Sequence, residues 1–269
     1  MDLYSYLKSQ HKHIISVDSE YRPLPGGNPE VVCFVYKDLI SGEVYRCLNK
    51  EDILNLPWPH DDAVYIVFNA LAETQSWLSW NIPIPYFIID LWIENKNLVQ
   101  DGVSKQKGFF GMLNVARRHG IDESLIMSDE EKDANRDKII NNTNYTEKQL
   151  VEILDYCEKD THLTEALLEP TLLAMEHRLQ PTTNEIRLGQ ILLRGRQKGL
   201  EAHLVFNGIS VDNELMDTYN KHWPKAKRQF LEKLNKQINV YEDGKFKQIN
   251  FENLYRPWIN PSMAKDTNG

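Results

Sequence analysis

The sequence has little cysteine and no long apolar run, and each shortage excludes a class of protein. Its three cysteines, Cys33, Cys47 and Cys157, are odd in number and lack metal-ligand spacing. A disulfide framework or a zinc site is therefore not expected, and they are interpreted as core or bystander residues. No apolar run approaches the roughly 20 residues that cross a bilayer. The N-terminal sequence MDLYSYLKSQ also lacks the basic start and apolar middle of a secretory signal, which favours a cytoplasmic protein without a membrane partner.

Positive charge is also scarce. The formal net charge of −8 excludes a globally cationic protein that coats nucleic acid. Residues 185–236 are an exception, with ten Lys and Arg against six Asp and Glu. Two interpretations of this basic segment stay open: it binds a nucleic-acid backbone, or it is an ordinary solvated face.

The chain of 269 residues suits one large domain, or one domain with an appendage. Within residues 14–48, the runs IISVD, VVCFVYKD and EVYRCL predict an antiparallel meander. Residues 63–68 and 86–89 then predict buried strands, residues 71–80 predict a helix, and Asp90 is a plausible cap for the next one. From residue 108 helices are expected to dominate, and the pattern as a whole predicts an α/β fold. Trp77, Trp80 and Trp92 are expected in the core rather than as base-stacking platforms.

The pair Asp18 and Glu20 follows an apolar, β-branched run. Residues two apart on a strand point to the same side, so these carboxylates would repel each other. In proteins, such repulsion is usually offset by a divalent cation that the carboxylate oxygens bind. The alternative interpretation is a strand that ends in a solvated polar turn.

Further acids are expected at helix positions. Glu73 lies in VFNALAETQSW, one turn into a helix that starts where a strand stops. A second helix is predicted to begin at Thr146, with Gln149 at capping-box spacing, and on it Tyr156 and Asp160 are i and i+4 on one face. Four converging carboxylates would hold two metal ions that clamp a phosphodiester. Taken singly, Glu73 at a helix start is typical of a helix cap. Tyr156 and Asp160 at i and i+4 are typical of a surface pair without a chemical role.

The segments VDSE, FNALAE and YCEKD, in this order, resemble the three exonuclease motifs of the DEDD superfamily. The resemblance is to its tyrosine variant, found in the 3′→5′ proofreading domain of family-A DNA polymerases. The longer stretches SVDSEYRPLPGGNPEVVCFVYKDLISGEVYR, NIPIPYFIIDLW, and RHGID followed by EKDANRD resemble the phage-type members. The stretch LLRGRQKGLEAHLVFNGISVDNELMDTYNKHW resembles the helices that open the polymerase thumb. Together these segments fall within residues 14–258.

The resemblance implies a ribonuclease H-like exonuclease fold over residues 1–180, with a mixed sheet, an antiparallel meander and flanking helices. Residues 181–269 would form a helical extension. It also implies a 3′→5′ exonuclease on DNA with a single-stranded or frayed 3′ end, which releases nucleoside 5′-monophosphates by two-metal-ion hydrolysis. The cofactors would be two divalent ions, Mg²⁺ or Mn²⁺.

The resemblance also implies residue roles. Asp18 would contact both metal ions, Glu20 and Asp160 would complete the first site, and Glu73 would hold the second through water. Tyr156 would aim the attacking water. Asn69, Lys132 and Arg136 are assigned to contacts with nucleic acid. Lys132 and Arg136 are i and i+4 in EKDANRD, so a solvated helix face is their alternative.

The sequence departs from the family in two ways. Glu73 and Phe68 stand where most of the superfamily carries Asp and often His, and the polymerase palm and fingers are missing. The final residues, MAKDTNG, are typical of a frayed tail and favour a stand-alone protein. The alternatives are a proofreading fragment of a family-A polymerase with a replication partner, a ribonuclease D-like enzyme that acts on RNA, and a catalytically idle nucleic-acid-binding module.

Overall fold

The structure is a computed structural model that describes residues 1–24, 28–59, 62–99, 108–178 and 182–256. By its internal contacts the chain divides into two units, Met1–Gly208 and Ile209–Gly269. The expected domain boundary between residues 180 and 181 lies outside the described residues. Among the described residues, no helix is both long and apolar enough to span a membrane.

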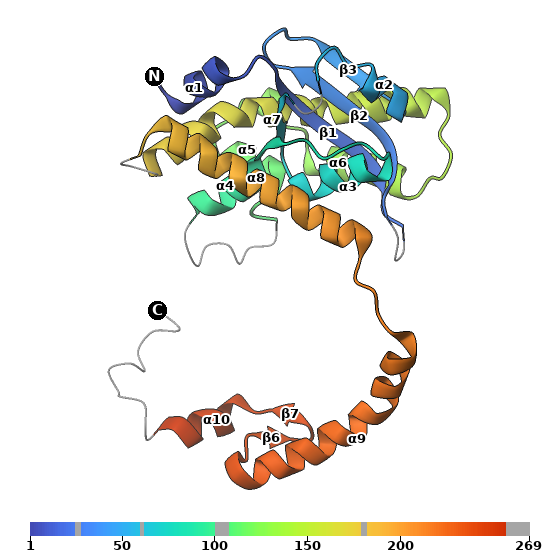
Figure 1. Ribbon diagram of the computed structural model, residues 1–269, viewed down its shortest axis with the longest axis vertical. Helices are drawn as coiled ribbons and strands as arrows, with labels where there is room; N and C mark the ends of the chain where they lie inside the picture. The colour runs from blue at the N-terminus through green and yellow to red at the C-terminus, as the bar shows by residue number, and fades with distance from the viewer. Residues whose placement is uncertain (25–27, 60–61, 100–107, 179–181, 257–269) are drawn as a thin grey trace. The chain divides into compact units, whose positions relative to one another are not determined.

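The first unit is built on a mixed five-stranded sheet with the strand order β3-β2-β1-β4-β5 (Figure 1). The strands are β1 (Ile14–Arg22), β2 (Glu30–Asp38), β3 (Val44–Cys47), β4 (Val64–Val67) and β5 (Phe87–Asp90). β1, β2 and β3 form the predicted antiparallel meander, whereas β4 and β5 run parallel to β1. This order and these directions are those of the ribonuclease H-like fold, so the predicted α/β class is confirmed.

Helices cover both faces of the sheet. In the first unit they are α1 (Leu3–Gln10), α2 (Lys50–Leu54), α3 (Ala70–Ser79), α4 (Leu91–Leu98), α5 (Met112–Arg118), the short 3₁₀ helix η2 (Glu123–Leu125), α6 (Asp129–Ile140), α7 (Glu147–Arg178) and α8 (Asn184–Asn207). The second unit contains α9 (Asn213–Ile238), the strands β6 (Tyr241–Glu242) and β7 (Lys245–Phe246), and α10 (Gln248–Tyr255).

Alternation along β1 sends successive side chains to opposite layers. Ile14 packs into the cluster beneath α7, whereas Ile15 and Val17 pack with Trp77 on the α3 side. Trp77 is fully buried, as predicted, and its Nε1 donates to the Tyr36 hydroxyl at 2.8 Å. Asp18 and Glu20 are an even number of residues from Ile14, so their side chains point to the same face of the sheet, the one that α7 covers.

Helix α8 belongs to the first unit because it packs closely on β5 and α3. A Cβ atom at Gly195 would lie 2.0 Å from the Ile88 carbonyl oxygen, so only glycine lets the two backbones approach this closely. The Arg194 guanidinium next to it forms two hydrogen bonds, of 2.7 and 2.6 Å, with the fully buried Glu94 of α4. The sequence that resembles a thumb therefore begins inside the sheet unit.

Candidate active site

The acidic pair on β1 lies just beyond the point where the parallel pairing of β1 with β4 ends. The parallel pairing of β1 with β4 ends at Ser16, whereas the antiparallel pairing with β2 continues to Arg22. Asp18 and Glu20 therefore extend past the end of β4 while their backbone stays hydrogen-bonded on the other side. The alternative of a strand that ends at these acids is wrong, because β1 continues beyond them with a register shift after Glu20.

Helix α3 starts directly after β4 and carries Glu73 in its first turn. Asn69 is at the N-cap position, but its side chain makes no hydrogen bond to the helix. Asp90 takes over the capping instead, and its Oδ2 accepts from the Ala70 N–H at 3.1 Å. Asp90 Oδ1 also accepts from Trp92 N at 2.9 Å and Ile93 N at 3.1 Å, so one buried carboxylate caps both α3 and α4.

Helix α7 supplies Tyr156 and Asp160, both buried, from the face predicted for them. Its start is the predicted capping box, with Thr146 N donating to Gln149 Oε1 at 2.9 Å and Gln149 N donating back to Thr146 Oγ1 at 3.3 Å. Helix α6 adds Lys132, whose Nζ donates to Asp160 Oδ2 at 2.8 Å. Lys132 therefore contacts a predicted metal ligand.

A cavity of about 520 Å³, which we call the carboxylate cavity, brings all eight predicted site residues together. Asp18, Glu20, Asn69, Glu73, Lys132, Arg136, Tyr156 and Asp160 all line it. The cavity thus collects side chains from β1, α3, α6 and α7. A larger cavity of about 630 Å³ in the second unit contains none of them.

Two carboxylate oxygens in this cavity have no hydrogen-bond partner. They are Glu73 Oε2 and Asp160 Oδ1, and each of these residues is only 4% exposed. A buried carboxylate without a partner is costly, and several such groups together are more so. Lys132 is the only cation that forms an ion pair with any of the four acids among the described residues. The donor set consists of hard oxygen ligands with unused lone pairs, which fits divalent cations.

The electrostatics of the cavity agree with this geometry. Burial, and next the neighbouring Asp160, raise the pKa of Asp18 to about 8. Burial, followed by the charge of Asp18, raises the pKa of Glu20 and that of Glu73 well above the usual range. The pKa of Tyr156 is also raised, first by burial and then by Asp160, so its hydroxyl keeps its proton at neutral pH. A divalent cation would offset this mutual repulsion and favour the ionised carboxylates.

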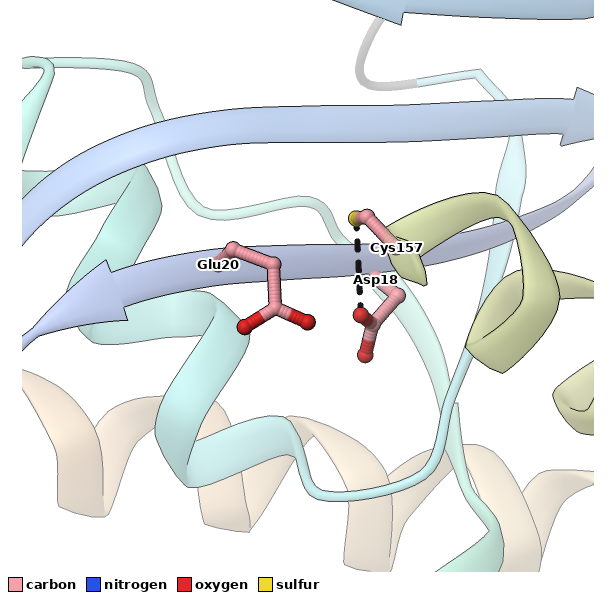
Figure 2. Close-up of side chains that lie close together, drawn as sticks. All are labelled: Asp18, Glu20 and Cys157. Carbon is pink, nitrogen blue, oxygen red and sulfur yellow. Dashed lines mark hydrogen bonds between the residues drawn. The ribbon is translucent and has the colours of Figure 1, made fainter. Parts of the chain in front are cut away.

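Cys157, expected as a core or bystander residue, is fully buried in the core and also contacts the site. Figure 2 shows its thiol directed at Asp18, with an Sγ to Oδ2 distance of 3.4 Å. Asp18, Glu20 and Cys157 each offer a ligand atom within 4.8 Å of the other two. Its place one residue after Tyr156, among the regularly spaced apolar residues of α7, was the signal available in the sequence. The double capping by Asp90 left no such signal, because it joins two helices through the sheet.

Comparisons with known proteins give structural neighbours but no family. No protein-family model matches the chain, and no curated protein matches it either. Among solved structures the chain is similar to the EXO domain of Nibbler from Aedes aegypti, with 16% sequence identity and a TM-score of 0.40. The match covers 71% of this chain and 91% of that chain. The likeness to phage-type family-A polymerases stays a prediction.

Proposed function

We propose that this protein is a metal-dependent nuclease, and specifically a 3′→5′ exonuclease that acts on DNA. The observation that carries the proposal is the set of four carboxylates around one cavity, two of them with buried oxygens that lack a partner. Such a set does not favour folding stability, because ion-paired or apolar residues in the same positions would cost less free energy to bury. It is a suitable device for holding divalent cations against a phosphodiester.

The residues divide into two groups of ligands. Asp18 and Glu20 from β1 and Asp160 from α7 would hold one cation, and Glu73 from α3 would hold a second together with Asp18. Bound Mg²⁺ or Mn²⁺ would supply a water of lowered pKa as the nucleophile and charge stabilisation for the departing oxygen. The oxygens Glu73 Oε2 and Asp160 Oδ1 are available for this purpose because no protein group occupies them.

Other side chains would position the substrate. Tyr156 keeps its proton, so it would orient the attacking water by a hydrogen bond rather than act as the base. Lys132 and Arg136 from α6 line the same cavity and would contact the terminal phosphate. Asn69 also lines the cavity, and its side chain is not used as a helix cap. Hydrolysis there would release a nucleoside 5′-monophosphate and leave a 3′-hydroxyl.

The test is the digestion of single-stranded DNA labelled at the 5′ or at the 3′ end, with Mg²⁺ or Mn²⁺ and with a chelator. A 3′→5′ exonuclease turns the 5′ label into a ladder and releases the 3′ label at once as a mononucleotide. The Asp18→Asn variant should lose this activity. Asp137→Asn is the matched control, since Asp137 is an exposed acid on α6 that does not line the cavity.

The alternatives predict different results in the same assay. A ribonuclease D-like enzyme would digest an RNA strand of the same sequence in preference to the DNA. An idle binding module would release nothing with either metal, and Asp18→Asn would equal the wild type. Equal release by wild type and Asp18→Asn would also reject the proposal, since the cluster would then have no part in the reaction.

A further inference from the structure

An aromatic depression of about 410 Å³ lies next to the carboxylate cavity. Residues 108–111 line it together with Phe68, Asn69 and Trp92. Phe68 and Asn69 also line the carboxylate cavity, so the two hollows share a wall. Trp92 is half-buried and packs against the core with part of its ring, so the prediction that it is a core residue holds only in part. We call this hollow the aromatic groove.

The phenyl rings of the groove are held in place by a tight turn. Gly108 has a φ of +78°, a left-handed conformation that favours glycine. Its carbonyl accepts from Gly111 N at 2.8 Å and from Asn114 Nδ2 at 3.0 Å. Phe109 and Phe110 meet edge to face with centroids 5.0 Å apart. Neither residue belongs to a buried core cluster, and both are partly exposed.

Cations accompany these rings. The Lys96 ammonium lies 4.1 Å from the centroid of Trp92, and the Arg118 guanidinium lies 4.0 Å from that of Phe109. Beyond the groove, a third hollow of about 280 Å³ is lined by Phe109, Asn114, Arg117 and Arg118. No acidic residue among those described lines the groove or this third hollow. The carboxylate cavity is therefore lined by acidic residues, whereas the third hollow is lined by arginines.

Acidic, aromatic and basic hollows in succession match the parts of a single nucleic-acid strand. Unpaired bases stack on aromatic rings, and the phosphates between them are attracted to lysine and arginine. A duplex would not fit this chemistry, because its bases are already stacked and paired. A peptide would leave the cations unused unless it were acidic, and an acidic peptide has no base to stack on the rings.

We propose that the aromatic groove binds the unpaired bases next to the 3′ end of a single nucleic-acid strand, with Phe110 as the stacking platform. Lys96 and Arg118 contact the phosphates of the same nucleotides. This inference rests on the proposed function, since it is the carboxylate cavity that receives the terminal nucleotide. It goes further by assigning the selection of single-stranded ends to the groove.

The experiment measures binding apart from cleavage. Fluorescence anisotropy with a labelled single-stranded oligonucleotide in chelator gives the dissociation constant without hydrolysis. Phe110→Ala should weaken binding by about tenfold, as the loss of one base stack would. Phe110→Tyr keeps a ring and should restore it. Tyr86→Ala is the matched control, because Tyr86 is an exposed aromatic residue that does not line the groove.

Lys96→Gln and Arg118→Gln give a second readout that does not depend on the ring. Each should weaken binding at low salt and make the logarithm of the affinity fall less steeply with the logarithm of salt concentration. In cleavage assays, Phe110→Ala should raise KM for a single-stranded oligonucleotide while kcat at saturation changes little. A blunt duplex should bind wild type and Phe110→Ala equally.

The outcomes separate this inference from the proposed function. If the wild type binds single strands through Phe110 but cleaves none, the inference that the aromatic groove binds single strands is supported and the nuclease proposal is rejected. If the wild type cleaves, and Phe110→Ala, Lys96→Gln and Arg118→Gln all bind single strands as tightly as Tyr86→Ala, the groove has no role and the inference is rejected. Equal weakening of single-strand and duplex binding by Phe110→Ala would reject it as well.

Discussion

The Lys132 ammonium donates to Asp160 Oδ2 at 2.8 Å, while the other oxygen of this carboxylate has no partner. A single lysine therefore offsets part of the negative charge of the carboxylate cavity, and it does so from a helix other than those that carry the acids. Burial lowers the pKa of Lys132, but Asp160 and the acids of β1 outweigh this effect and raise it overall, so the ammonium keeps its charge.

Removing this ammonium should destabilise the protein when no metal is present. Lys132→Gln leaves Asp160 without its ion pair, which should cost about 1–2 kcal/mol of unfolding free energy, a value kept low because the lysine is partly exposed. Urea unfolding in chelator measures the loss, and Mn²⁺ should reduce it by supplying positive charge. Lys138→Gln is the control, since Lys138 pairs with Glu152 on the surface. A loss unaffected by Mn²⁺ would argue against a cation site.

Stability without metal should depend on pH in an unusual direction. The pKa of Asp18 in the folded protein, about 8, is far above the value of about 4 expected in the unfolded chain. The folded state therefore binds more protons, so the stability from this group is complete below about pH 4 and is lost as pH rises toward about 8. Urea unfolding at several pH values in chelator measures the slope. Asp18→Asn should flatten it, and an unchanged slope would contradict the assignment.

The cap that Asp90 provides should matter more than an ordinary helix cap. Asp90→Ala removes acceptors from the starts of both α3 and α4, and at about 1 kcal/mol for each cap it should cost about 2–3 kcal/mol. Asp122→Ala is the control, since Asp122 is an exposed cap that accepts from Ser124 N at the start of the single short helix η2. Chemical denaturation compares the two variants. Equal losses would show that the link between the helices adds nothing.

The hydroxyl of Tyr156 is expected to act in the reaction and not in folding. Tyr156→Phe should lower kcat by about 100-fold, the scale of a misplaced reactant, with little change in KM or in unfolding free energy. Tyr145→Phe is the matched control, because Tyr145 does not line the cavity and its hydroxyl donates to a backbone carbonyl, that of Ile139. An unchanged kcat in Tyr156→Phe would remove this residue from the mechanism.

Gly195 should tolerate no side chain while α8 remains on the sheet. Gly195→Ala would place a methyl group against the Ile88 carbonyl and force the helix away from β5, so we expect a loss of about 2–3 kcal/mol. Gly189→Ala on the same helix meets no neighbouring atom and serves as the control. Thermal unfolding measures both variants. Similar melting temperatures would mean that α8 does not need this close approach.

The local elements followed from the sequence because they depend on near neighbours. Runs of β-branched and apolar residues separated by turn signals predicted β1 and β2, and the pair Thr146 and Gln149 predicted the start of α7. Spacing alone also placed Asp18 with Glu20, and Tyr156 with Asp160, on common faces. These relations span at most four residues, so periodicity is enough to determine them.

Other relations required the tertiary structure, because their partners are far apart in the chain. Asp90 caps α3 across 20 residues, and Cys157 reaches Asp18 across 139. The point at which β1 loses its parallel partner depends on where β4 ends, and no pattern within β1 indicates it. The sequence by itself therefore determined which acids could share a site. Only the packing of α3, α6 and α7 around the end of β4 decided that they surround one cavity, because convergence depends on how the elements pack together.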